Sequence, residues 1–244
     1  MEPFFFGPPH RRLFGILTRP AQATSSSGAV ICPPLGQEAI RSHRSLRLLS
    51  ENLAQAGLSS LRFDYYGTGD SAGDLDSARP SKWMGDIRLA AQELRERVGL
   101  TRLVMVGLRL GGFLAALAEA RAIGRLILWD PVTDPRGYLE AARTQGREDE
   151  TQGLDWLGFY YPAHFLYELA SLSLEGVRRV PREVKIVVSR ESPELPLFRE
   201  ALELRKARVE EHHLDAPPAW FEEEALGAGA VPVGVLHRIR EWAR

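Results

Sequence analysis

The fold prediction for this chain rests on one stretch, Gly107-Leu108-Arg109-Leu110-Gly111-Gly112. This stretch follows the apolar run Leu103–Val106, which is typical of a strand buried inside a parallel sheet. A helix of small residues is expected directly afterwards, over Leu110–Ala120. Glycines on both sides of Arg109 permit a tight, strained turn in which neighbouring backbones pass closely. The stretch therefore predicts a strand-to-helix turn that exposes the side chain of Arg109.

Outside this turn, short β-rich runs alternate with amphipathic helices along most of the chain. Strands are expected over Phe4–Phe6, Leu13–Thr18, Ala29–Cys32, Leu58–Phe63, Leu103–Val106, Ile123–Trp129, Val184–Ser189 and Val209–Leu214. Helices are expected over Gln37–Ala56, from about Trp83 to Val98, over Leu110–Ala120 and Leu195–Lys206, and from Pro232 onward. This order predicts a mostly parallel sheet covered by helices on both faces.

Composition and charge argue against nucleic-acid binding, a disulfide-rich secreted fold and a transmembrane protein. Lys and Arg total 31 and Asp and Glu total 32, so no overall basic field favours nucleic acid or an anionic membrane. The single cysteine, Cys32, excludes a disulfide framework within the chain and fits a reducing compartment. No apolar run has the length of a transmembrane segment, and the first residues do not read as a signal peptide. We therefore expect a cytoplasmic protein without nucleic-acid partners.

Three motifs together resemble the α/β-hydrolases. The glycine-framed turn is similar to the nucleophile elbow Gly-X-Ser-X-Gly, with Arg109 at the serine position. The segment Cys32–Glu38 (CPPLGQE) stands where that fold places its oxyanion loop. The loop Phe63–Ser71 (FDYYGTGDS) resembles the D-x-x-G-x-G-x-S motif of the serine aminopeptidase-like group. It is also similar to hydrolases found with exosortase systems and with secondary-metabolite clusters. The resemblance implies a single α/β-hydrolase domain over residues 1–244, with a lid or cap insertion over about residues 133–180.

The same resemblance implies hydrolysis or transfer of acyl groups on a small ester, thioester or amide. It also implies that the backbone amides of Leu35 and Leu110 act as oxyanion donors. An arginine, however, stays protonated and cannot act as an ordinary nucleophile. Two interpretations of Arg109 stay open. Either it binds an anionic ligand at the helix N-terminus, or it pairs internally, for example with Asp130 or Glu191, and locks the turn.

The other members of a catalytic triad are also in doubt. Glu191 is the nearest carboxylate after the strand Val184–Ser189, and Asp130 is a second candidate acid. The loop where the fold places its histidine contains none, so His213, at the end of the preceding strand, is the nearest candidate base. Cys32 is more typical of a small buried hydrophobe than of a nucleophile. Ser71 and Asp64 are more typical of groups that order their loop.

Two hypotheses follow from this incomplete triad. The first is a hydrolase or acyl transferase with a non-standard site around Arg109, in which a carboxylate or His213 activates water. The second is a non-catalytic protein that keeps the pocket and binds an anionic ligand or a biosynthetic partner protein.

The insertion concentrates aromatic residues at Trp156, Phe159, Tyr160, Tyr161, Phe165 and Tyr167. They either form a lid that recognises an acyl chain or pack into the core, and we expect Trp156, Phe159 and Tyr160 to line the pocket. Arg41, Arg44 and Arg47 form either a solvated helix face or a docking surface for an acidic partner. We read Glu222–Glu224 as a solvated turn. No zinc-ligand spacing, phosphate loop or dinucleotide fingerprint is visible, so we expect no metal and no cofactor.

Overall fold

The structure, a computed structural model, describes residues 1–22, 26–120, 122–175, 177–220 and 231–244. Its main sheet has the strand order β1-β2-β4-β3-β5-β6-β10-β11. The pairs β1–β2 and β2–β4 are antiparallel, and the other neighbours are parallel. The strands span β1 Glu2–Phe6, β2 Leu13–Thr18, β3 Ser27–Cys32, β4 Ser59–Phe63, β5 Arg102–Leu108, β6 Ile123–Trp129, β10 Glu183–Val188 and β11 Arg208–His213.

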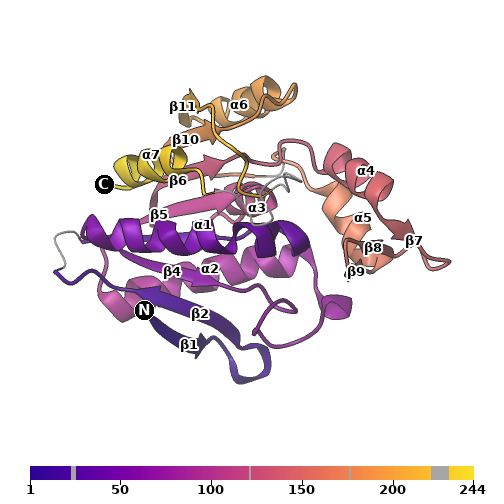
Figure 1. Cartoon of the computed structure of the whole chain (residues 1–244), viewed down its shortest axis with the longest axis horizontal. Coiled ribbons are helices and arrows are strands. Elements are labelled where there is room, and N and C mark those ends of the chain that lie inside the picture. The colour runs from indigo at the N-terminus through magenta and orange to yellow at the C-terminus, as the bar shows by residue number, and fades with distance from the viewer. Residues whose placement is uncertain (23–25, 121, 176, 221–230) are drawn as a thin grey trace.

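Helices cover both faces of this sheet, as predicted (Figure 1). These helices span α1 Gly36–Gln55, α2 Pro80–Val98, α3 Leu110–Leu117, α6 Leu195–Glu203 and α7 Val233–Ala243. On one face, α1 and α7 pack apolar residues such as Leu49 and Ile239 against the sheet. On the other face, α2, α3 and α6 contribute Ile87, Phe113 and Phe198 to a separate core. The carboxyl ends of the parallel strands are thereby left to the loops, where sites occur in such sheets.

Some element ends differ from the prediction because tertiary contacts decide them. Strand β3 begins at Ser27, two residues before the predicted start, because Ser27 and Gly28 pair with β5. Helix α3 ends at Leu117 instead of Ala120, because Glu119 adopts a φ of 46°, which a right-handed helix does not contain. Helix α6 likewise ends three residues before the predicted Lys206, which has a φ of 66°.

The insertion that follows β6 folds into helices and a small sheet at one end of the molecule (Figure 1). Its elements are α4 Pro135–Gln145, β7 Arg147–Glu148, β8 Leu154–Trp156, β9 Phe159–Tyr161 and α5 Ala163–Ser171. Asp134 starts α4, since its carboxylate accepts the N–H groups of Arg136 (3.0 Å) and Gly137 (2.9 Å). Phe165 and Leu169 of α5 join the same core as α2. The insertion is therefore packed onto the main domain.

Helices long and apolar enough to span a membrane are absent from the described residues.

The glycines of the strand-to-helix turn are required by close backbone packing. A Cβ on Gly111 would lie 2.2 Å from the carbonyl oxygen of Pro33 and 2.5 Å from that of Cys32. A Cβ on Gly107 would lie 2.4 Å from the Cα of Gly112. The turn before α3 is thus pressed against the loop after β3, and side chains at these positions would separate the two.

Replacing Gly111 by alanine should lower the free energy of unfolding by about 1–3 kcal/mol, because the new methyl group meets backbone atoms that cannot move aside. Urea denaturation followed by circular dichroism measures this change. Gly234→Ala is the matched control: it lies in α7 with nothing within 4 Å of its Cβ position, so it should be neutral or stabilising. Equal stabilities of the Gly111→Ala variant and the wild type would contradict the packing argument.

Candidate functional site

Arg109 occupies the turn between β5 and α3 in a strained conformation. Its φ is 52° and its ψ is −125°, values that few non-glycine residues adopt. Backbone hydrogen bonds hold the turn: the Arg109 N–H donates to the Trp129 carbonyl (3.0 Å), and the Val132 N–H donates to the Arg109 carbonyl (3.2 Å). The predicted sharp turn is confirmed, with an arginine at its apex.

The side chain of Arg109 is paired inside the protein. Its Nε donates to Glu38 Oε1 at 3.2 Å, and its Nη1 donates to the backbone carbonyl of Asp130 at 3.2 Å. The guanidinium carbon also lies 3.8 Å from the centroid of the Trp220 ring, within the range of a cation–π contact. Only 17% of the side chain is exposed. The turn therefore does not expose this side chain as expected. Of the two interpretations of Arg109, the structure shows internal pairing: the carboxylate is that of Glu38 and not of Asp130 or Glu191, while Asp130 contributes its backbone carbonyl.

Glu38 joins three elements through one buried carboxylate. It lies in the first turn of α1, and its Oε2 accepts a hydrogen bond from the Tyr138 hydroxyl of α4 at 3.0 Å. Burial raises the pKa of Glu38, while the charge and hydrogen bond of Arg109 and the hydrogen bond of Tyr138 oppose that rise. Glu38 lies in the segment expected to form the oxyanion loop, but no role was predicted for it. Its position two residues after Gly36, at a helix start, was the available signal.

Asp130 is committed to a different set of partners. Its carboxylate accepts the N–H (2.6 Å) and the Oγ–H (2.7 Å) of Ser189, and the Nε1–H of Trp220 (3.2 Å). These bonds anchor the loop after β10 and the ring that covers Arg109. Both carboxylate oxygens of Asp130 thus accept hydrogen bonds from Ser189 or Trp220, while Arg109 bonds to the Asp130 backbone carbonyl and to Glu38.

The remaining predicted triad members are not assembled around the turn. Glu191 is exposed, although it borders the same small pocket of about 400 Å³ as Arg109. His213 is exposed at the end of the edge strand β11, where its Nε2 lies 2.5 Å from Glu211 Oε1. His213 borders neither this pocket nor a second, larger cavity of about 790 Å³ at the carboxyl ends of β3 and β4. An acid–base pair centred on Arg109 is thus not formed by these residues.

The alternative nucleophiles have structural roles. Cys32 is fully buried, and burial raises the pKa of its thiol far above the usual range. The Ser71 hydroxyl donates to the Asp64 carbonyl (2.7 Å) and accepts the Phe14 N–H (2.8 Å). Asp64 Oδ2 accepts the N–H of Asp70 at 3.1 Å. Ser71 and Asp64 order their loop, as predicted.

The cavity of about 790 Å³ opens at the carboxyl ends of β3 and β4, and its lining includes the loop after β3 but no residue of the turn at Arg109. Its walls are mostly apolar and come from β2, the first turns of α1, the loop after β4 and the insertion. Its lining residues include Phe14, Ile16, Leu35, Ala39, Ile40, Arg62, Asp64, Tyr65, Trp83, Phe159 and Tyr161. The volume of the cavity and its mostly apolar lining are typical of a binding site for a small molecule.

The predicted pocket residues of the insertion divide into two groups. Phe159 borders the cavity, and Tyr161, which the prediction left out, borders it as well. Tyr160 and Trp156 do not border it. The Tyr160 hydroxyl points outward to Asp149 (2.7 Å), and Trp156 packs edge-on against Tyr138. The alternation of side chains along the short strand β9 sends Phe159 and Tyr161 inward and Tyr160 outward. A lid function for the insertion stays a prediction.

The two expected oxyanion donors lie on opposite sides of the contact between the turn and the loop. Leu35 precedes α1 and borders the large cavity, and Leu110 is the first residue of α3. The first amides of a helix lack helical acceptors, so both positions keep the donor character that the prediction requires. Their role with a bound ligand stays a prediction.

Two clusters of charged residues were singled out in the sequence, the arginines of α1 and Glu222–Glu224. Arg44 and Arg47 are exposed on α1, and Arg47 Nε donates to Glu51 at 3.0 Å. Docking of an acidic or biosynthetic partner there stays a prediction. Glu222–Glu224 lie outside the described residues. Across the part of the chain that the structure covers, no three His, Cys, Asp or Glu side chains gather as a metal site would require.

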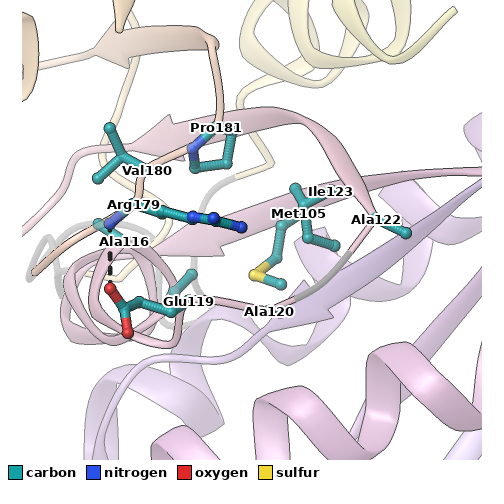
Figure 2. A pocket seen from close by; sticks show the side chains of 10 residues that line it. Met105, Ala116, Glu119, Ala120, Ala122, Ile123, Arg179, Val180 and Pro181 are labelled. Carbon is teal, nitrogen blue, oxygen red and sulfur yellow. Dashed lines mark hydrogen bonds between the residues drawn. The ribbon is translucent and has the colours of Figure 1, made fainter. Parts of the chain in front are cut away.

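A separate hollow of about 500 Å³ lies at the opposite end of β6, beside its first residue, Ile123 (Figure 2). Arg179 projects into it, and the Glu119 carboxylate beside it accepts the backbone N–H groups of Arg178 (2.6 Å) and Arg179 (3.0 Å). Arg109 adjoins the other end of β6, so this hollow is distinct from the site around the turn.

Comparison with known proteins identifies the fold. No protein-family profile and no curated protein sequence matches the chain. Solved structures match over almost its whole length. Est1E from Butyrivibrio proteoclasticus, with ferulic acid bound, is 18% identical, has a TM-score of 0.77, and is matched over 98% of this chain and 97% of its own.

Two further structures agree. A serine hydrolase without a lid from Xanthomonas campestris is 16% identical, with a TM-score of 0.63 and coverage of 99% and 91%. Mouse α/β hydrolase domain-containing protein 10 is 18% identical, with a TM-score of 0.64 and coverage of 99% and 98%. The chain thus has the predicted α/β-hydrolase fold. The serine aminopeptidase-like subgroup stays a prediction.

The Glu38–Arg109 pair should behave as a coupled unit in stability measurements. Glu38→Gln and Arg109→Met should each lower the free energy of unfolding by about 3 kcal/mol, because each leaves a largely buried charge without its partner. The double variant should lose clearly less than the sum of the two.

Urea denaturation of the four proteins measures this coupling. The exposed pair Glu140–Arg143 is the matched control, and Glu140→Gln should cost less than about 1 kcal/mol. Additive losses in the double variant would show that the two side chains act independently.

Proposed function

We propose that this chain is a non-hydrolytic protein of α/β-hydrolase fold that binds a small, largely apolar molecule in the 790 Å³ cavity. One observation carries the proposal: the apex of the turn, where such enzymes hold their nucleophile, is occupied by an arginine that is already paired with Glu38.

The chemistry of the apex argues against acyl transfer. A serine works there because a base removes its proton and its oxygen attacks the substrate. The guanidinium of Arg109 keeps its proton and has no lone pair to offer. Its charge is balanced by Glu38, and its face is covered by Trp220, so it is also poorly placed to bind a free anion. Cys32 and Ser71 are held in structural roles and do not replace it.

The cavity supports the binding part of the proposal. Ligand sites typically occupy about 300–1,000 Å³, with aromatic and aliphatic walls and a few polar groups. Tyr65 stacks on Trp83 with a centroid distance of 4.8 Å, which gives the inner wall a flat aromatic surface. One structural neighbour, Est1E, holds ferulic acid, an aromatic acid of a size that such a cavity accommodates.

Hydrolysis is the second candidate, favoured by the neighbours, which include a serine hydrolase and lipolytic enzymes. In this chain it would need a water molecule activated by a carboxylate. Glu38 is the carboxylate paired with Arg109, but both of its oxygens accept hydrogen bonds, from Arg109 and from Tyr138. The geometry therefore supports binding better than hydrolysis.

The folded protein should give no stoichiometric adduct with a fluorophosphonate probe, because the apex holds no activated serine. Intact-protein mass spectrometry measures the adduct, and an active serine hydrolase treated in parallel is the control. A panel of p-nitrophenyl esters should show no turnover above buffer. A stoichiometric adduct or enzymatic turnover would favour the hydrolase candidate, and peptide mapping would then locate the nucleophile.

Filling the cavity should abolish ligand binding without unfolding the protein. Ala39→Phe places a ring into the cavity from α1, so binding of 1-dodecanol or ferulic acid, measured by calorimetry, should weaken by at least about tenfold. Arg44→Phe adds the same ring at an exposed position of α1 outside the cavity and should bind like the wild type. Unchanged binding in Ala39→Phe would place the ligand elsewhere.

A further inference from the structure

An arginine without an internal acceptor lies in the wall of the large cavity. Arg62 is the fourth residue of β4, where it pairs in register with Ile16 of β2 and Ile31 of β3. It borders the cavity together with Ile40 and Leu46 of α1. Its Nε is buried and has no hydrogen-bond partner, and no ion pair to Arg62 occurs within the described ranges of the chain.

Three other partly buried arginines, Arg11, Arg109 and Arg125, each have a carboxylate partner within the protein. Arg11 also has a buried Nε without a partner, but its Nη2 donates to Asp86 Oδ1 (2.7 Å) and to the Lys82 carbonyl (2.9 Å). Arg125 donates to Glu183 (2.7 Å), as Arg109 does to Glu38. Arg62 has no such partner, although a buried charge requires compensation. Arg95 of α2 also has no side-chain partner among the described residues, but Arg62 borders the large cavity and Arg95 does not.

The acids nearest to Arg62 are occupied elsewhere. Asp64 turns into its own loop, where its Oδ2 accepts the Asp70 N–H and lies against Gly69. Glu51 accepts a hydrogen bond from Arg47 Nε at 3.0 Å. Both acids are close enough to favour the charged guanidinium, yet burial outweighs them and the net effect lowers the pKa of Arg62. Arg62 thus lacks an internal acceptor in the wall of a mostly apolar cavity, which Asp64 and Asp70 also border.

We propose that the cavity takes an amphiphilic anion, a carboxylate with an apolar body, whose head group binds the Arg62 guanidinium. This inference rests on the proposed binding function and names its ligand class. The planar guanidinium donates well to a carboxylate, and such charge-assisted bonds are strong where water is partly excluded. The apolar body lies along Phe14 and Ile16 and reaches the aromatic wall of Tyr65 and Trp83.

Matched probes test the head group. Isothermal titration calorimetry compares dodecanoate with 1-dodecanol, both below their aggregation limits, on the wild type and on Arg62→Gln. The wild type should bind dodecanoate at least about tenfold more tightly than the alcohol. Arg62→Gln should lose that preference and keep its affinity for 1-dodecanol within about twofold. Arg95→Gln, a partly buried arginine of α2 outside the described cavities, is the control and should behave like the wild type.

The outcomes distinguish a failure of the head-group assignment from a failure of the proposed binding function. Equal binding of the two probes by the wild type would overturn the head-group assignment and leave the binding function standing. A preference that survives in Arg62→Gln would also overturn it. Binding of neither probe would count against both. Arg62→Lys keeps the positive charge and should retain part of the preference for dodecanoate. Circular dichroism checks that both Arg62 variants are folded.

Discussion

The ion pair between Glu38 and Arg109 is the interaction on which the site depends. It connects the first turn of α1 to the turn before α3, and the Tyr138 hydroxyl extends it to α4 of the insertion. Removing two charges from water is costly, and their mutual attraction repays that cost only when other hydrogen bonds complete the geometry. Here the Asp130 carbonyl and the ring of Trp220 complete the surroundings of Arg109. Loops that meet at the carboxyl edge of the sheet are thus held in one arrangement.

The same turn keeps a strained backbone although its apex carries no nucleophile. Holding a non-glycine residue at positive φ costs about 1–3 kcal/mol and persists only where the surrounding packing imposes it. Gly107, Gly111 and Gly112 supply that packing, because the chain before α3 rests directly on the carbonyls of Cys32 and Pro33. The conformation therefore belongs to the architecture of the strand edge, and the residue at the apex decides only what is presented there.

The sequence was sufficient for the order of the strands of the main sheet and of the helices that cover it, because apolar runs and helical spacing are local signals. It did not predict α4, α5 and the strands β7–β9 of the insertion, which are short and lack a clear period. It was also sufficient for the strained turn, since glycines framed it. The carboxylate partner of Arg109 could not be predicted from the sequence, because Glu38 is 71 residues away. The choice between Glu38 and Asp130 also depends on the hydrogen bonds that Ser189 and Trp220 make to Asp130. The inward side of β9 was missed for a related reason: a three-residue strand has too little alternation to show which of Phe159, Tyr160 and Tyr161 faces the cavity. Arg62 lay inside a correctly predicted strand, yet its lack of an acceptor is visible only in three dimensions.

The pairing at the turn also bears on the direction in which this protein can evolve. A single change of Arg109 to serine would leave the buried Glu38 carboxylate without its cation, and the new hydroxyl would find no histidine beside it, because His213 stands on the edge strand. Acquiring serine chemistry would thus require several substitutions, the first of which lowers stability and brings no activity. Once the salt bridge is in place, substitutions that change which ligand the cavity binds are more accessible than substitutions that create a hydrolytic site.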